Sequence, residues 1–422
     1  MPRVGFRPRN ITWGTVTLAV MLWGFPPCWG AIVKTGLTGL ICFFAAALNG
    51  CDDDTSRRLV NDAATADGGF TVDASAKDAA DPSPVNLGAG YNATVTLDPA
   101  GTGYISWIGA EPTVTSLQFC ALPRGAAACS VRTTIATEGT SLSRPFVVVN
   151  GTTVKVLSYR YGLTTPDFAA VFLFTSLDGG RTFGVGRKVG KTPFSAAVLG
   201  PEDSVSLTTN AYQNGLAYQR VPLGETPAPT TEAILSTTHV YSGAVALYNG
   251  TTPVVVSATG DGAAQVRVYV GESDFNLATS WTPAVNIGPG DRMHLASGSS
   301  GLFLLAQVAN AFQVRRFDGT TFGAGVPLPE GTGEFAQAHF VSDPAGQLHV
   351  VWPRVDVQGV RLDYATSDNG AVWQHRIVVR DEGFGGVRAA VAADHRGFAV
   401  WETHASAPLA KVHVLPLAPA GL

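Results

Sequence analysis

The sequence predicts an all-β protein whose main part is a single β-propeller of seven four-stranded blades. Three observations predict it: a composition suited to short strands and tight turns, a long internal repeat, and the lack of sustained helical periodicity. The 422 residues include 48 Gly and 26 Pro, and only 14% are charged, against roughly 25% in an average soluble protein. Gly and Pro favour turns, whereas the plentiful Val, Thr and Phe favour strands.

The repeat is a turn rich in Gly, Asp and Asn followed by an apolar strand. Its seven turns are anchored at Gly103, Gly151, Asp203, Gly250, Gly301, Gly346 and Gly397, with spacings of 48, 52, 47, 51, 45 and 51 residues. Four strands of about 5–6 residues and four turns fill such a period. Six blades, or an array of β-sandwiches, are the alternatives. The last copy has room for only three strands, so we expect one terminus to donate a strand to the blade of the other.

Residues 1–50 are interpreted as the signal-peptide region. Lys34, an apolar run over residues 37–48 and small residues before Cys51 resemble the bacterial lipobox, in which a peptidase cuts before an acylated cysteine. A signal of ordinary length begins at Val33, which we take as a candidate for the true start of translation. Two or three lipid chains on Cys51 would hold the protein on a membrane, because each buried methylene contributes about 0.8 kcal/mol. A membrane-spanning helix is the alternative, but prolines and Lys34 interrupt the apolar stretch.

Residues 51–85 are expected to form the lipidated cysteine and a disordered acidic tether. Residues 52–85 contain eight Asp against three basic residues and a single aromatic residue. Such a segment cannot bury enough apolar surface to offset the entropy of ordering it. The third segment, residues 86–422, is the predicted propeller, placed in the cell envelope and exported to the outer membrane or cell surface.

Two cysteines, Cys120 and Cys129, remain beyond the signal and Cys51. An even pair in an exported chain indicates a disulfide. A turn between two apolar runs separates them, so the bridge would link the two strands of one hairpin.

One segment matches the Asp-box pattern Ser-x-Asp-x-Gly-x-Thr-aromatic at every defined position, through Ser176, Asp178, Gly180, Thr182 and Phe183. A second copy comprises Thr366, Asp368, Gly370 and Trp373, with Thr in place of Ser and Val in place of Thr. With these boxes, residues 90–422 resemble the sialidase superfamily of Asp-box (BNR repeat) propellers. The resemblance implies that each box holds a turn between two outer strands, away from the family's active site. Its aspartate would accept backbone N–H groups and its glycine would allow a positive φ.

Active members of that family clamp a carboxylate with three arginines, because the planar guanidinium meets a carboxylate in bidentate fashion. Arg144, Arg292 and Arg388 stand at equivalent repeat positions, near the start of innermost strands, and are the predicted ligand-binding residues. Asp291, His294, Glu334, His339 and Glu382 lie near the same strand starts. Catalytic residues are not predicted, because the family's Phe-Arg-Ile-Pro signature is reduced to Ser143-Arg144-Pro145 and no Tyr–Glu pair can be assigned.

The net charge of −4 gives no general attraction to nucleic acid. No cofactor is predicted, and the eight scattered histidines fit no metal-binding spacing. The leading hypothesis is a lipid-anchored propeller that binds a glycan, peptide or protein at one mouth without catalysis. An exo-acting glycoside hydrolase of sialidase type and a structural envelope protein without a ligand are the alternatives.

Overall fold

The computed structural model describes residues 83–110, 115–136, 140–141, 144–161, 169–211, 215–224, 232–238, 240–259, 265–332, 338–381, 383–403 and 410–418. The signal region, Val33, Cys51 and the tether to residue 82 lie outside these residues. The described part consists of strands and one short 3-10 turn, η2 (Ala278–Ser280), which contacts β13 (Ala233–Ser236). Within it, no helix has the length and apolar character needed to cross a membrane.

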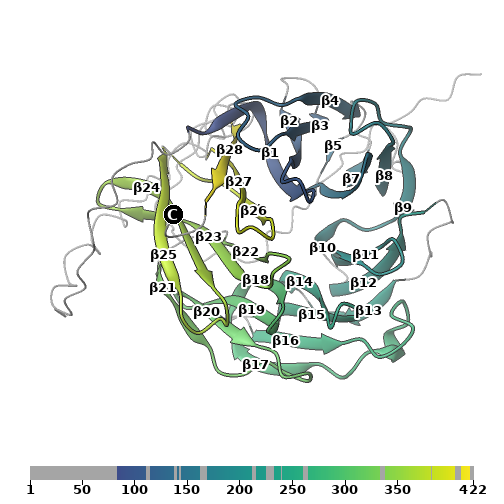
Figure 1. The fold of residues 1–422 in the computed structure, drawn as a ribbon. Coiled ribbons are helices and arrows are strands. Elements are labelled where there is room, and N and C mark those ends of the chain that lie inside the picture. Colours follow the sequence, from purple (N-terminus) through teal and green to yellow (C-terminus); the bar gives the residue numbers. More distant parts are fainter. Residues whose placement is uncertain are drawn as a thin grey trace, which may run out of the picture. The chain divides into compact units, whose positions relative to one another are not determined.

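The strands form blades that follow one another around a ring, with the first strand of each blade on the inside (Figure 1). Blades 1 and 2 contain β1 (Val85–Leu97), β2 (Gly103–Ala110), β3 (Thr115–Leu122) and β4 (Val131–Ala136), then β5 (Thr140–Ser141) with β6 (Phe146–Asn150), β7 (Thr153–Tyr161), β8 (Ala170–Ser176) and β9 (Arg187–Gly190). Blades 3 and 4 contain β10 (Phe194–Gly200), β11 (Ser204–Ala211), β12 (Gly215–Pro222) and β13, then β14 (Val240–Tyr248), β15 (Thr252–Thr259), β16 (Gln265–Val270) and β17 (Val285–Pro289).

Blades 5 and 6 contain β18 (Asp291–Gly298), β19 (Gly301–Val308), β20 (Ala311–Arg316) and β21 (Val326–Thr332), then β22 (His339–Ser342), β23 (Leu348–Asp356), β24 (Gly359–Ser367) and β25 (Gln374–Asp381). Blade 7 contains β26 (Val387–Val391), β27 (Gly397–Glu402), β28 (Lys411–Leu417) and the first part of β1. All these strand pairings are antiparallel, as the hairpin connections require.

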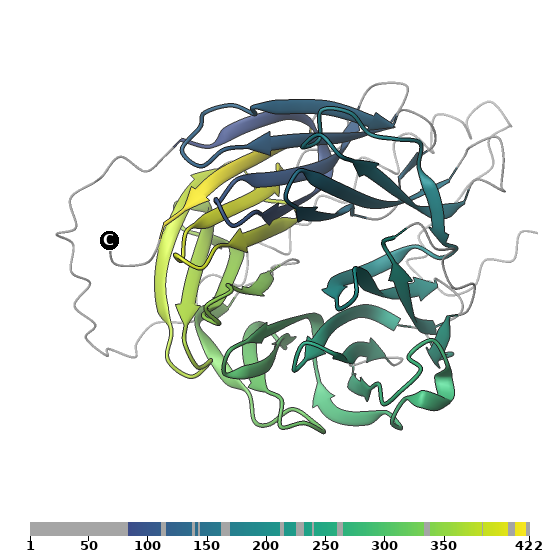
Figure 2. The same ribbon diagram turned by 45° about the vertical axis from the view of Figure 1, so that its right-hand side comes forward.

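The N-terminal strand closes the ring. Val85–Ala89 of β1 pair with β28, and Gly90–Leu97 pair with β2. β1 changes partner between Ala89 and Gly90, and its pairing with β2 then shifts register around Asn92, whose φ of 55° lies in the left-handed region. Blades 7 and 1 therefore share one seven-stranded sheet, and the yellow β28 lies beside the purple start of β1 (Figure 2). The N-terminal end is thus the terminus that donates a strand to the other's blade.

Seven apolar clusters lie between neighbouring blades, one at each interface of the ring. Blades 7 and 1, for example, share a core in which Trp107 of β2 and Phe398 and Val400 of β27 are buried. Because each blade is covered on both faces, its second strand is largely buried, and every residue of β2 is buried. The prediction of an all-β propeller with seven four-stranded blades is confirmed.

The anchors of the sequence repeat lie in the turn between the first and second strands of a blade, or on the first residue of the second strand. Gly346 shows why glycine is needed there. Its φ is 89°, and a Cβ atom on it would lie 2.2 Å from the backbone nitrogen of Ser299 in blade 5. The turn thus approaches the neighbouring blade too closely for a side chain.

Candidate functional site

Five polar side chains from several blades gather at the inner strands. We call them the inner cluster, and they are Arg144 just before β6, His294 on β18, His339 on β22, Arg388 on β26 and Glu402 at the end of β27. The inner strands of adjacent blades 5, 6, 7 and 1 contact one another in turn, and β1 contacts β6. The ring of inner strands therefore brings together residues that are far apart in the sequence.

Glu402 links three parts of this region. Its Oε1 accepts a hydrogen bond from the backbone nitrogen of Gly386 at 2.9 Å, and its Oε2 accepts one from the backbone nitrogen of Asn92 at the bend of β1. Arg144 Nη2 lies 3.8 Å from Oε1. Two backbone N–H donors and a guanidinium therefore surround its carboxylate group.

Arg144 and Arg388 are close enough to repel each other. Burial and then the charge of Arg144 lower the pKa of Arg388 well below its usual value, while Glu402 acts in the opposite direction. Burial also lowers the pKa of Arg144, again opposed by Glu402. Guanidinium groups stay protonated in proteins. In the described residues Arg388 donates to the carbonyl of Val387 at 2.6 Å and forms no ion pair, and Arg144 Nε is buried without an acceptor.

The two histidines of the inner cluster are neutral. Burial first, and then the charges of Arg388 and Arg144, lower the pKa of His294 to about 3. The same causes, together with His294, lower the pKa of His339 well below its usual value. His339 Nδ1 accepts a hydrogen bond from the backbone nitrogen of Ala389 at 2.9 Å, and the two rings meet edge to face. With two guanidinium groups and one carboxylate, the inner cluster carries a net charge of +1.

Of the three arginines predicted from the sequence, the structure brings Arg144 and Arg388 together. Arg292 has a different partner: its Nη1 lies 3.2 Å from Gln307 Oε1 on β19. Arg292 lies at a register shift of β18 with a φ of 47°. Glu334 and Glu382 lie outside the described residues.

The first Asp-box segment forms the turn between β8 and β9. Asp178 accepts hydrogen bonds from the Thr182 hydroxyl at 2.6 Å, the Thr182 backbone nitrogen at 2.9 Å and the Ser176 hydroxyl at 2.7 Å. These hydrogen bonds lower the pKa of Asp178 to about 2, and the two from Thr182 have the largest effect. Gly180, with a φ of 90°, packs on Phe119 of blade 1, and Phe183 meets the same ring edge to face. The turn fastens blade 2 to blade 1.

The second box requires a correction. Asp368 was expected to hold this turn, but Asn369 Oδ1 accepts the backbone nitrogens of Ala371 and Val372, at 2.9 and 3.2 Å. The Gly370 nitrogen donates to Ser367 rather than to Thr366. The loop is one residue shorter than in blade 2, so the roles of the serine and the aspartate move by one position, to Ser367 and Asn369. Asp368 instead accepts from Gln347 Nε2 at 2.8 Å. Gly370 still packs on a phenylalanine of the preceding blade, Phe303, and Trp373 packs on the core of blades 5 and 6.

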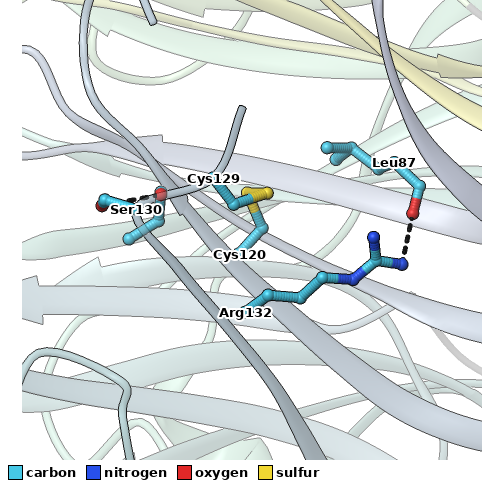
Figure 3. Close-up of a disulfide and its surroundings, with 6 residues drawn as sticks. Leu87, Cys120, Cys129, Ser130 and Arg132 are labelled. Carbon is cyan, nitrogen blue, oxygen red and sulfur yellow. Dashed lines mark hydrogen bonds between the residues drawn. A yellow bond between two sulfur atoms is a disulfide. The ribbon is translucent and has the colours of Figure 1, made fainter. Parts of the chain in front are cut away.

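Cys120 and Cys129 are joined by a disulfide across the hairpin of β3 and β4, with Cα atoms 5.6 Å apart (Figure 3). On β4, Arg132 donates to the carbonyl of Leu87 at 2.7 Å and lies over the ring of Trp107. Leu87 belongs to the part of β1 that closes the ring. The bridged hairpin is therefore connected directly to the closing strand.

Two groups of residues were missed by reasoning from the sequence. Glu402 lies at the end of a second strand, whereas candidates were sought at the starts of inner strands. Asp343 and His395 lie in the turns that follow β22 and β26, and His349 is the second residue of β23; the three meet at the opposite ends of the inner strands from the inner cluster. We call these three residues the turn cluster. The recurring Asp-Pro-Ala-Gly turn at Asp98 and Asp343 was the one signal pointing to this place.

Comparison with known proteins finds related folds. No family model matches the chain, and no curated protein matches it. The Penicillium chrysogenum alpha-L-arabinanase complexed with arabinobiose is 14% identical with a TM-score of 0.46, covering 68% of this chain and 98% of that one. YCF48 bound to D1 peptide is 13% identical with a TM-score of 0.48, covering 81% and 96%. The GH93 alpha-L-arabinofuranosidase of Fusarium graminearum with arabinobiose is 11% identical with a TM-score of 0.45, covering 80% and 98%. These are β-propeller proteins, and the likeness concerns the fold alone.

Proposed function

We propose that this chain is an exported, lipid-anchored β-propeller that binds a carboxylate-bearing ligand, such as an acidic glycan, at the inner cluster without transforming it. The single observation that carries the proposal is the pairing of Arg144 and Arg388 with only one carboxylate, Glu402, among the described residues. Two buried like charges raise the free energy of the folded protein unless a further anion joins them.

The hydrogen-bond donors of the inner cluster suit a carboxylate ligand. Among the described residues, Arg144 Nε is buried without an acceptor, and the hydrogen bond of Arg388 goes to a main-chain carbonyl. A guanidinium binds a carboxylate through two parallel N–H donors, which gives geometric specificity as well as binding energy. The neutral histidines add hydrogen-bonding groups that do not compete for the negative charge. The inner cluster therefore favours an anion over a cation.

Binding without turnover follows from what the cluster contains. A glycoside hydrolase uses two carboxylates or, in sialidases, a tyrosine nucleophile with its base. In the described part of the inner cluster the one carboxylate, Glu402, is held by two backbone nitrogens and a guanidinium. Both of its oxygens accept hydrogen bonds from the protein, and the described part of the inner cluster lacks the second carboxylate or the tyrosine that those mechanisms use.

The lipid anchor and tether extend this proposal to the whole chain. The lipobox-like sequence ending at Cys51 would place the propeller at a membrane surface. Mass spectrometry of the protein isolated from its native membrane tests this part. A mature chain that begins with acylated Cys51 is expected, and an intact signal region would overturn it.

Calorimetric titration with N-acetylneuraminate, glucuronate and neutral glucose tests the binding proposal. We expect one of the acidic sugars to bind and glucose not to bind. Arg388→Gln should weaken binding roughly tenfold to a hundredfold, because a charged hydrogen-bonding partner contributes about 1.5–3 kcal/mol. Arg388→Lys keeps the charge without the planar fork and should bind more weakly than the wild type.

Arg181→Gln is the matched control, because Arg181 is an exposed residue of the Asp-box turn. It should bind like the wild type. Unfolding curves for each variant separate lost binding from lost folding. The proposal fails if neither acidic sugar binds, if Arg388→Gln folds and binds normally, or if a fluorogenic sialoside is hydrolysed.

A further inference from the structure

The turn cluster joins blades 6 and 7 through three potential metal ligands. Asp343 follows β22, His349 is the second residue of β23, and His395 lies in the turn between β26 and β27. His349 Nε2 lies 3.2 Å and His395 Nδ1 lies 2.6 Å from the same oxygen, Asp343 Oδ2. The three ligand atoms all lie within 4.8 Å of one another. We propose that Asp343, His349 and His395 bind one divalent transition-metal ion, with Zn²⁺ the preferred ion.

Comparison with blade 1 separates this arrangement from an ordinary turn. Asp98 begins the same Asp-Pro-Ala-Gly turn, and its Oδ2 accepts a hydrogen bond from the hydroxyl of Tyr104 at 3.2 Å. The phenol supplies its own proton, which completes the contact. At the equivalent position blade 6 has His349, and blade 7 adds His395. Two imidazole nitrogens and a carboxylate oxygen form a donor set typical of zinc and other late first-row metals.

Further hydrogen bonds orient His349 and Asp343 as metal ligands. His349 Nδ1 lies 2.7 Å from the hydroxyl of Tyr364, so the imidazole is fixed through the nitrogen that would not bind the metal. Metal-binding histidines are commonly held in this way. Asp343 Oδ1 accepts the backbone nitrogen of Gln347 at 2.9 Å, which leaves Oδ2 directed at the two histidines.

His395 takes its place from the turn between β26 and β27. Its φ is 62°, in the left-handed region that Asp203 and Asn249 also adopt in the equivalent turns of blades 3 and 4. This conformation presents the ring to Asp343 across the blade boundary.

Burial and spacing suit an ion that enters from solvent. Asp343 and His349 side chains are 0% exposed, whereas that of His395 is 39% exposed. Metal–ligand bonds of about 2.0–2.2 Å in a tetrahedron place ligand atoms about 3.3 Å apart. The His349–Asp343 separation already matches. The exposed His395 ring would shift so that its nitrogen, now 2.6 Å from Asp343 Oδ2 and within 4.8 Å of the His349 ligand atom, reaches this spacing. The fourth coordination position of the ion would face solvent and could hold a water molecule.

A metal titration of the full-length chain tests the site. After treatment with a chelator and dialysis, the protein is titrated with Zn²⁺ alone, and bound zinc is counted by mass spectrometry after gel filtration. We expect one zinc per chain that depends on the turn cluster. Co²⁺ should give the visible absorption of a tetrahedral site with nitrogen and oxygen ligands.

His395→Gln is the decisive variant, because the half-exposed ring can be replaced without opening the core. It should weaken zinc binding at least tenfold and remove the Co²⁺ spectrum. His375→Gln is the matched control: His375 forms a single pair with Asp363, 2.9 Å apart, in the same blade. It should bind zinc as the wild type does. The proposal is overturned if the wild type retains no zinc, or if a folded His395→Gln binds zinc with unchanged affinity.

Discussion

The inner cluster and the turn cluster each contain two histidines, yet their charged neighbours have opposite signs. In the inner cluster, two arginines surround neutral histidines and only one carboxylate balances them. In the turn cluster, both histidines face the buried carboxylate of Asp343, and Asp368 is connected to it through Gln347. The same residue type therefore serves two environments, one suited to an anion and one to a cation.

The difference follows from position along the inner strands. At the starts of the inner strands, the inner cluster contains residues from blades 2, 5, 6 and 7, so side chains from four different segments of the chain lie together there. At the opposite end, the turns bring neighbouring blades together, as Asp343 of blade 6 contacts His395 of blade 7. A ligand at the strand starts would touch several blades, whereas an ion in the turns would link two.

The largest effect is expected from removing the carboxylate of the inner cluster. Glu402→Ala leaves two guanidinium groups and two backbone nitrogens without their anion, and should lower the free energy of unfolding by about 3 kcal/mol. Urea denaturation measures it. Glu402→Gln keeps one acceptor and should lose less, and Glu272→Ala, at an exposed site, should change stability by at most about 0.5 kcal/mol. A Glu402→Ala variant as stable as Glu272→Ala would mean that the inner cluster is not held by Glu402.

The second effect is a loss of stability in mild acid that originates in the inner cluster. His294 has a folded pKa of about 3, below the value of about 6.5 in an unfolded chain, so the unfolded state binds more protons between these limits. Stability is therefore complete above pH 6.5 and falls as the pH drops toward 3. The loss from His294 between pH 6.5 and 5 is at most about 2 kcal/mol. Urea unfolding of His294→Gln over this range should show a shallower dependence on pH, and an unchanged slope would contradict a neutral His294.

The repeated blades of this molecule could be predicted from the sequence, whereas the contacts between distant parts of the chain could not. Evenly spaced turns such as those at Gly151 and Gly346 were sufficient to count the blades, because each blade repeats the same local pattern. The closing strand was not assignable, since it depends on pairing of Val85–Ala89 with β28 at the far end of the chain. Asp368 was misassigned because one residue fewer in the turn gives the aspartate's role to Asn369.

Residues of the candidate site could be predicted only where they stand at equivalent positions of the sequence repeat. Arg144 and Arg388 stand at equivalent strand starts, and the structure brings them together. Glu402 stands at no such position. His395 lies 52 residues after Asp343, so no short motif joins the two, and only the packing of blades 6 and 7 brings them together.

The smallest effect distinguishes the turns of blades 6 and 1. Tyr364→Phe removes the hydroxyl beside the fully buried His349 Nδ1 and should cost about 1–2 kcal/mol, because the nitrogen cannot reach water. Tyr104→Phe removes the hydroxyl beside the half-exposed Asp98, which water can solvate, and should cost about 0.5 kcal/mol. Chemical denaturation of both variants without metal measures the difference. Equal losses would mean that His349 is no more dependent on its orienting hydrogen bond than an ordinary turn residue, and would remove the reason to regard the blade 6 turn as more than a copy of the one in blade 1.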